Sequence, residues 1–223
     1  MKKFCKTLFA VAGIMVIVGA ITILAAIIIY NRSGSIVGDV TYTFVGAGGD
    51  DIRSLNVFTA YGKNVYREGS EWSVTFNDVY LKGAFCGVND HTLYVKTEGP
   101  GEIELFGWKI GLFFDFNKNR RAETIITYPA GVELDSVFSE AGISRIDADK
   151  LRAKTVLIQA PFCGIKLKGA VISDRFVIDT LVGNVRSSYG DIAKLTADMR
   201  MGRLAIAGSS STEVEYKSKL ILK

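Results

Sequence analysis

The amino-acid sequence predicts an all-β fold: a β-solenoid with glycine-cornered rungs of about 19–22 residues, preceded by one N-terminal transmembrane helix. Three observations lead to this prediction. Residues 8–30 contain no charged side chain, the rest of the sequence lacks an apolar stripe of helical period, and glycines recur at positions 142, 164, 183 and 202. We therefore expect a tail (1–7), a transmembrane helix (8–30), a tether (31–39) and a β-solenoid domain (40–223).

The apolar segment 8–30 is long enough to cross a bilayer. At about 1.5 Å per residue it reaches about 34 Å as a helix, and the hydrocarbon core is about 30 Å thick. A cleaved secretory signal is the alternative, but its apolar region spans only about 7–15 residues. Lys2, Lys3 and Lys6 precede the segment and Arg32 follows it. The positive-inside rule therefore predicts a single-pass protein of the cell membrane, with a cytoplasmic N-terminus and an extracytoplasmic C-terminal domain.

The composition limits the function classes. The chain has 27 basic and 23 acidic side chains, and three of the basic ones precede the apolar segment. The β domain is therefore close to neutral and has no bulk electrostatic reason to bind nucleic acid. A single histidine, His91, excludes multi-histidine metal sites and argues against a histidine-based triad. Cys86 and Cys163 both lie in apolar stretches, and the sequence leaves open whether they pair.

Short β-branched and aromatic runs predict strands in the first half of the domain. These runs cover residues 41–45, 52–57, 65–67, 72–76, 79–81, 92–96, 103–106 and 125–128. We expect turns at 61–64 and 68–70, and a further turn at His91, which follows Asn89 and Asp90.

The second half repeats a pattern of strand, glycine corner, strand and polar turn. The units span residues 134–150, 155–175, 176–194 and 195–213, and a fifth begins at 214. A period near 20 without a helical segment is typical of a β-solenoid, in which stacked rungs share a core. An ordinary β-sandwich with regular turns is the alternative. The expected core positions are Val171, Phe176, Ile178, Leu181 and Val185.

Segments 50–76, 91–98 and 124–151, followed by the repeats to residue 213, resemble the bacterial putative adhesin family. The resemblance lies in turns and apolar spacing over about residues 40–223. It implies a β-solenoid domain of unknown function behind one membrane helix. It brings no catalytic residues, and the aromatic-rich stretch 103–121 departs from the family pattern.

The densest aromatic cluster, with its basic edge, is the binding candidate. Its members are Phe106, Trp108, Phe113, Phe114, Phe116, Arg120 and Arg121. Aromatic faces stack on sugar rings or anchor a protein partner. Alternatively, the cluster caps an open end of the solenoid, where an exposed apolar rung invites aggregation.

Aspartates recur along the repeats, at positions 147, 149, 174, 179 and 191. Stacked carboxylates ligate Ca²⁺ or act as the paired acid and base of a glycosidase. Their positions within the repeats do not coincide well, which favours solvated turn residues. We therefore expect no catalytic residue, no metal site and no cofactor.

These features together predict a membrane-anchored, extracytoplasmic domain that is adhesin-like or binds a partner without catalysis. The expected partner is an envelope protein or a glycan of unknown identity, besides the lipid bilayer, and no nucleic acid. Two alternatives remain open. One is an envelope-sensing regulatory membrane protein, and the other is a carbohydrate-active β-helix enzyme.

Overall fold

A computed structural model of the chain describes residues 37–44, 51–98, 102–105, 108–111, 122–208 and 212–217. The backbone divides into two units, residues 1–36 and residues 37–223. The predicted anchor, residues 8–30, lies outside the described residues. The predicted tether ends at residue 39, but strand β1 already begins at Val37.

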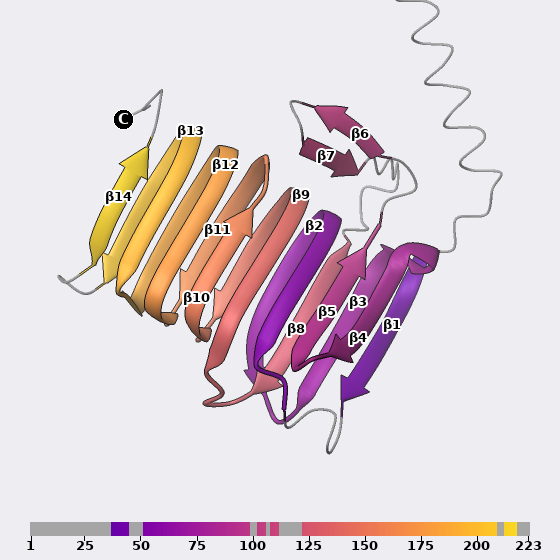
Figure 1. The fold of residues 1–223 in the computed structure, drawn as a ribbon. Helices are drawn as coiled ribbons and strands as arrows, with labels where there is room; N and C mark the ends of the chain where they lie inside the picture. The colour runs from indigo at the N-terminus through magenta and orange to yellow at the C-terminus, as the bar shows by residue number, and fades with distance from the viewer. Residues whose placement is uncertain are drawn as a thin grey trace, which may run out of the picture. The chain divides into compact units, whose positions relative to one another are not determined.

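The described part of the second unit is all-β, and its main sheet has twelve strands arranged in two layers (Figure 1). Strands β2 (Ser54–Gly69), β9 (Leu134–Asp149), β12 (Val171–Ile192) and β13 (Lys194–Gly208) run through both layers. The first layer consists of the first parts of these four strands together with β4 (Ala84–Asn89), β5 (Thr92–Thr97), β10 (Arg152–Gln159) and β14 (Glu213–Lys217). The second layer consists of the last parts of the same four strands together with β1 (Val37–Phe44), β3 (Trp72–Tyr80), β8 (Glu123–Pro129) and β11 (Phe162–Lys168).

Two smaller elements complete the fold. A separate hairpin consists of β6 (Glu102–Leu105) and β7 (Trp108–Gly111). A short 3₁₀ helix, η2 (Leu81–Gly83), links β3 to β4.

Four parallel strands close a ring in the order β9, β10, β12, β11 and back to β9. The ring closes because β9 and β12 each pair with β10 in the first layer and with β11 in the second. Paired residues from β9 onward are 19 or 20 positions apart, as Phe176 and Leu195 or Phe162 and Val182 show, except for Gly190 and Gly208 after a register shift at the end of β12. Side chains at one position of successive strands therefore form rows across each layer.

The structure confirms the all-β class but contradicts the predicted β-solenoid behind a transmembrane helix. A rung of a solenoid contacts only the rungs next to it in sequence. Here, Leu55 of β2 pairs with Val137 of β9, far along the chain, and β1, β3 and β8 pair in antiparallel fashion. The glycine spacing carried no information about these long-range pairings.

The predicted single-pass localisation at the cell membrane is also contradicted. Over the ranges that the structure describes, no helix combines the length and the apolar character needed to span a bilayer. The residues for which we expected such a helix are not among those ranges.

Alternating residues of each strand point between the layers and form the core. Phe176 and Ile178 do so in the first layer and Val185 in the second, and all three are fully buried, as predicted. Val171 and Leu181 are only half-buried. Val171 begins β12, and Leu181 lies where β12 passes from one layer to the other, so neither is covered on all sides.

Only some of the recurring glycines are required by the backbone. Gly202 has a φ of +143° and pairs with Gly183, whose carbonyl oxygen a Cβ at position 202 would overlap. Gly164 pairs instead with Arg145 and Asn184, and a Cβ there would meet open space. The predicted role of glycine as a tight corner is therefore wrong for Gly164.

We expect Gly202→Ala to lower the free energy of unfolding by about 2–4 kcal/mol, because it combines an unfavourable φ with a backbone clash. The matched change Gly164→Ala should stay within about 0.5 kcal/mol of the wild type. Denaturant titration of the two variants of the full chain measures both effects. Equal destabilisation by the two changes would contradict this account of the glycines.

A second expectation concerns alkaline pH. Burial raises the pKa of the Tyr66 hydroxyl from 10.0 to about 12. The folded state therefore holds this proton more tightly than the unfolded state, so the stabilisation is complete below pH 10 and is lost as the pH rises towards 12. The slope from this one group is at most about 1.4 kcal/mol per pH unit. Thermal unfolding between pH 8 and 12 should show a shallower decline for Tyr66→Phe, whereas Tyr189→Phe, at an exposed side chain, should follow the wild type.

Candidate functional site

Most of the predicted binding cluster lies outside the described residues. This holds for Phe106, Phe113, Phe114, Phe116, Arg120 and Arg121. The remaining member, Trp108, begins β7 and pairs through its backbone with Leu105 of β6. The role of this cluster therefore stays a prediction.

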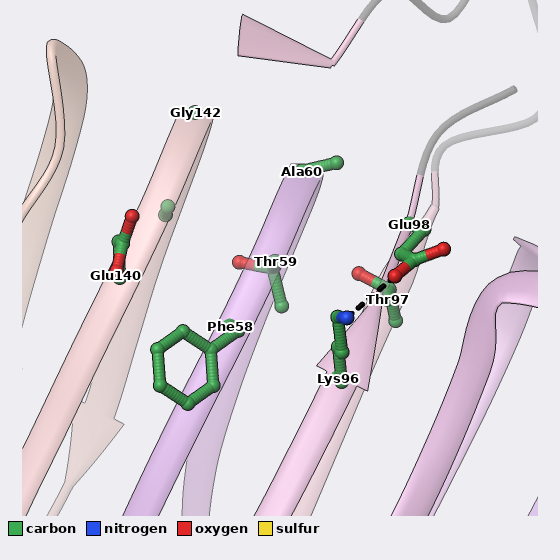
Figure 2. Close-up of a pocket in the computed structure, with 9 residues that line it drawn as sticks. Phe58, Thr59, Ala60, Lys96, Thr97, Glu98, Glu140 and Gly142 are labelled. Carbon is green, nitrogen blue, oxygen red and sulfur yellow. Dashed lines mark ion pairs between the residues drawn. The ribbon is translucent and has the colours of Figure 1, made fainter. Parts of the chain in front are cut away.

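A groove of about 440 Å³ opens in the first layer, where β5 and the first parts of β2 and β9 end (Figure 2). We call it the Phe58 groove. Its lining residues are Phe58, Thr59, Ala60, Lys96, Thr97, Glu98, Glu140, Ala141 and Gly142. Three of these residues, Ala60, Ala141 and Gly142, have small side chains or none, which leaves space beside the larger ones.

Phe58 is the aromatic side chain of this groove. Its neighbours Val57 and Thr59 are buried, so the alternation of β2 places Phe58 on the outer face of the layer. It lies between Lys96 of β5 and Glu140 of β9 (Figure 2). The Phe58 ring packs against the Phe138 ring at 5.5 Å between centroids with an interplanar angle of 61°. This edge contact fixes the orientation of a ring that is only half-buried.

Polar groups surround the ring and support the floor of the groove. Lys96 forms an ion pair with Glu98 (Figure 2), whereas the Glu140 side chain is exposed. The buried Thr59 Oγ1 accepts a hydrogen bond from Asn64 Nδ2 at 2.8 Å. This bond ties the end of the first-layer part of β2 to its second-layer part, so the groove has a fixed floor.

Phe58 is part of a row of outward side chains that runs across the first layer from strand to strand. Register places Glu140, Gln159, Asp179 and Asp198 next to one another on β9, β10, β12 and β13. Desolvation raises the pKa of Asp179, and the neighbouring Asp198 adds to this shift. The row offers one amide and three carboxyl groups beside an aromatic ring.

The other aspartates singled out by the sequence lie in strands rather than in the expected turns. Asp147 Oδ1 accepts a hydrogen bond from Arg145 Nε at 2.9 Å, and its Oδ2 lies 3.6 Å from Lys63 Nζ. Thr155 Oγ1 donates to Asp174 at 3.3 Å. Among the residues with described positions, no three acidic, histidine or cysteine side chains gather as metal ligands do.

His91 and the cysteines have local structural roles. Asp90 and His91 form the two-residue turn between β4 and β5, with φ values of 46° and 60°, which confirms the expected turn. Cys86 and Cys163 are free thiols in different layers. Burial raises the pKa of both thiols.

No model of a known protein family matches the chain, and no curated protein matches it. The solved structures that resemble it include two proteins. One is a putative cell adhesion protein from Clostridium sporogenes ATCC 15579, at 11% identity and a TM-score of 0.47, over 82% of this chain and 100% of that one. The other is a putative adhesin from Bacteroides fragilis NCTC 9343, at 13% identity and a TM-score of 0.45, over 83% and 95%. Their descriptions agree with the family resemblance, but a likeness at this level carries no functional argument.

Proposed function

We propose that the β domain is an adhesin-like binding module without catalytic activity, and that it holds a carbohydrate at the Phe58 groove. One observation supports this most directly. A half-buried aromatic ring with a fixed orientation borders a groove of about 440 Å³ and stands between a lysine and a glutamate. Small-ligand sites commonly combine an apolar wall with a few charged or polar groups that set the ligand orientation.

The chemistry of the groove matches that of a sugar ring. A sugar presents C–H groups on its faces, which pack on an aromatic side chain, and hydroxyl groups at its edge. Lys96, Glu98 and Glu140 are placed to exchange charge-assisted hydrogen bonds with those hydroxyls. Gln159 and Asp179 continue the row beyond Glu140, so a second sugar of a linear chain meets further polar partners.

The two predicted alternatives fare differently. The envelope-sensing membrane protein requires the single-pass helix, so the correction of the localisation removes its basis. The carbohydrate-active enzyme requires two facing carboxylates. Asp179 and Asp198 are neighbours in register, but neither lines the Phe58 groove, where the aromatic ring lies.

The groove is tested by glycan-array binding with the full chain. We expect Phe58→Ala to weaken binding to the recognised glycan by about tenfold, because a buried aromatic contact contributes roughly 1–2 kcal/mol. Tyr189→Ala is the control: its ring is 88% exposed at the end of β12, outside the groove. This control should bind like the wild type.

Three results would contradict the proposal. The first is a wild-type chain that binds no glycan on the array. The second is equal binding by wild type and Phe58→Ala. The third is cleavage of the bound glycan, seen as new reducing ends, that disappears in Asp179→Asn or Asp198→Asn; this result would instead favour the enzyme.

A further inference from the structure

The outer face of the second layer is basic over β11, β12 and β13. The outward positions of these strands (162 to 168, 182 to 188 and 201 to 207, taken alternately) carry four cations and no carboxylate. The cations are Lys166, Lys168, Arg186 and Arg203, and all four are exposed. Within the described part of the chain, none of them forms an ion pair.

A hollow of about 330 Å³ lies within this basic surface. Its lining residues are Arg145, Gly164, Ile165, Lys166, Asn184 and Arg186. The hollow exists because Gly164, which lies between Arg145 and Asn184 in register, has no side chain. The space around a Cβ at position 164 is open, so neither packing nor backbone conformation requires glycine there. We call this feature the basic hollow.

Of the three cations that line the basic hollow, Arg145 is paired with Asp147, whereas Lys166 and Arg186 form no ion pair within the described part of the chain. Asp147 is the register neighbour of Lys166 on β9, but its carboxylate is engaged by Arg145 at 2.9 Å and Lys63 at 3.6 Å. Asp149 is the register neighbour of Lys168 and lies one position beyond the hollow on the same face. On the other side, β12 and β13 add Arg186 and Arg203 without a counter-charge.

An exposed apolar row runs beside the cations, two positions before Arg145 and Arg203 and four positions before Lys166 and Arg186. The row consists of Ile143, Phe162, Val182 and Met201, with exposed fractions of 55%, 39%, 37% and 42%. These are large side chains on four adjacent strands about 4.8 Å apart. The second layer therefore presents an apolar line perpendicular to its strands, with the cations spread over the adjoining rows of the same face.

We propose that the basic hollow and the neighbouring cations bind a linear anionic polysaccharide that lies across β9, β11, β12 and β13. A carboxylate of one sugar enters the hollow between Lys166 and Arg186, beside the Asp147-paired Arg145, and a later carboxylate meets Arg203. The C–H faces of the sugars pack on the apolar row. This site is separate from the Phe58 groove and does not depend on it.

The geometry favours this occupant over other polyanions. A bilayer surface is broad and flat and does not enter a recess in the protein surface, whereas a single carboxylate group of a polymer does. Duplex nucleic acid is attracted mainly by bulk positive charge, and the β domain is close to neutral. The apolar line and the cations beside it match a polymer that alternates C–H faces with carboxylates.

The test uses the full chain and two forms of one polymer, polygalacturonate and its methyl ester, in which the charge is removed. Calorimetry at low salt should detect binding to polygalacturonate only, and about 0.5 M NaCl should weaken it because salt screens exposed charges. The charge reversal Lys166→Glu with Arg186→Glu should reduce affinity at least about tenfold. Arg152→Glu with Arg175→Glu changes the charge equally at exposed first-layer positions and should leave binding intact.

Gly164→Leu separates the hollow from simple charge attraction. It fills the hollow without removing a cation, and the open space at this position allows the protein to fold. We expect a loss of affinity for polygalacturonate, whereas Phe58→Ala should have no effect. Equal binding of the methyl ester, unchanged binding by Gly164→Leu, or tighter binding of duplex DNA or phosphatidylglycerol vesicles would each overturn the proposal.

Discussion

The whole domain depends on the fixed register between strands that pass through both layers. Side chains of a strand alternate between the two faces, so a slip of one residue would move every core residue to the surface. The register therefore sets which positions become rows of the core and which become rows of the surface. One inward row consists of Leu55, Val137, Val156, Phe176 and Leu195, all at most 2% exposed.

The bends at which a strand passes from one layer to the other need additional hydrogen-bond partners, because a bend interrupts the ladder of backbone hydrogen bonds. In β2, the bend lies at Gly62, whose φ is +105° and which lies close to Ala122. The Lys63 amide next to it donates a hydrogen bond to the Ala122 carbonyl oxygen at 2.9 Å. In β12, the buried Thr180 Oγ1 lies 3.4 and 3.2 Å from the carbonyl oxygens of Pro161 and Val182. A glycine with positive φ at one bend and a buried threonine hydroxyl at the other thus allow the backbone groups there to keep hydrogen-bond partners.

Local pattern predicted much of this fold, because alternation is a property of neighbouring residues. The strand at 72–76 and the core residues Phe176, Ile178 and Val185 follow directly from it. The expected turn at 61–64 is instead a bend inside β2, since the same residues suit either role. The pairing of β2 with β9 was not predictable from local pattern, because both strands alternate in the same way as many others.

The same reasoning applies to the candidate sites. The outward position of Phe58 was predictable in principle, because Leu55 and Val57 point inward and the side chains of a strand alternate between its two faces. Its groove was not, because Lys96 and Glu140 reach it only through the pairing of β5 and β9 with β2. The aromatic cluster around Trp108 was easier to see because its members are close in sequence.

The net charge of +4 conceals how the charges are distributed, since some carboxylates and some cations gather in different surface rows rather than in different parts of the chain. In β12, Asp179 faces outward in the first layer and Arg186, seven residues later, faces outward in the second. Because each long strand contributes to both layers, every window of the sequence mixes the two surfaces and averages towards neutrality. The row of Glu140, Asp179 and Asp198 would repel an anionic polymer, whereas Lys166 and Arg186, which are neighbours in register, and the nearby Arg203 would attract it. If both proposals hold, a nearly neutral domain would therefore take a polyanion at the basic hollow and an uncharged sugar at the Phe58 groove.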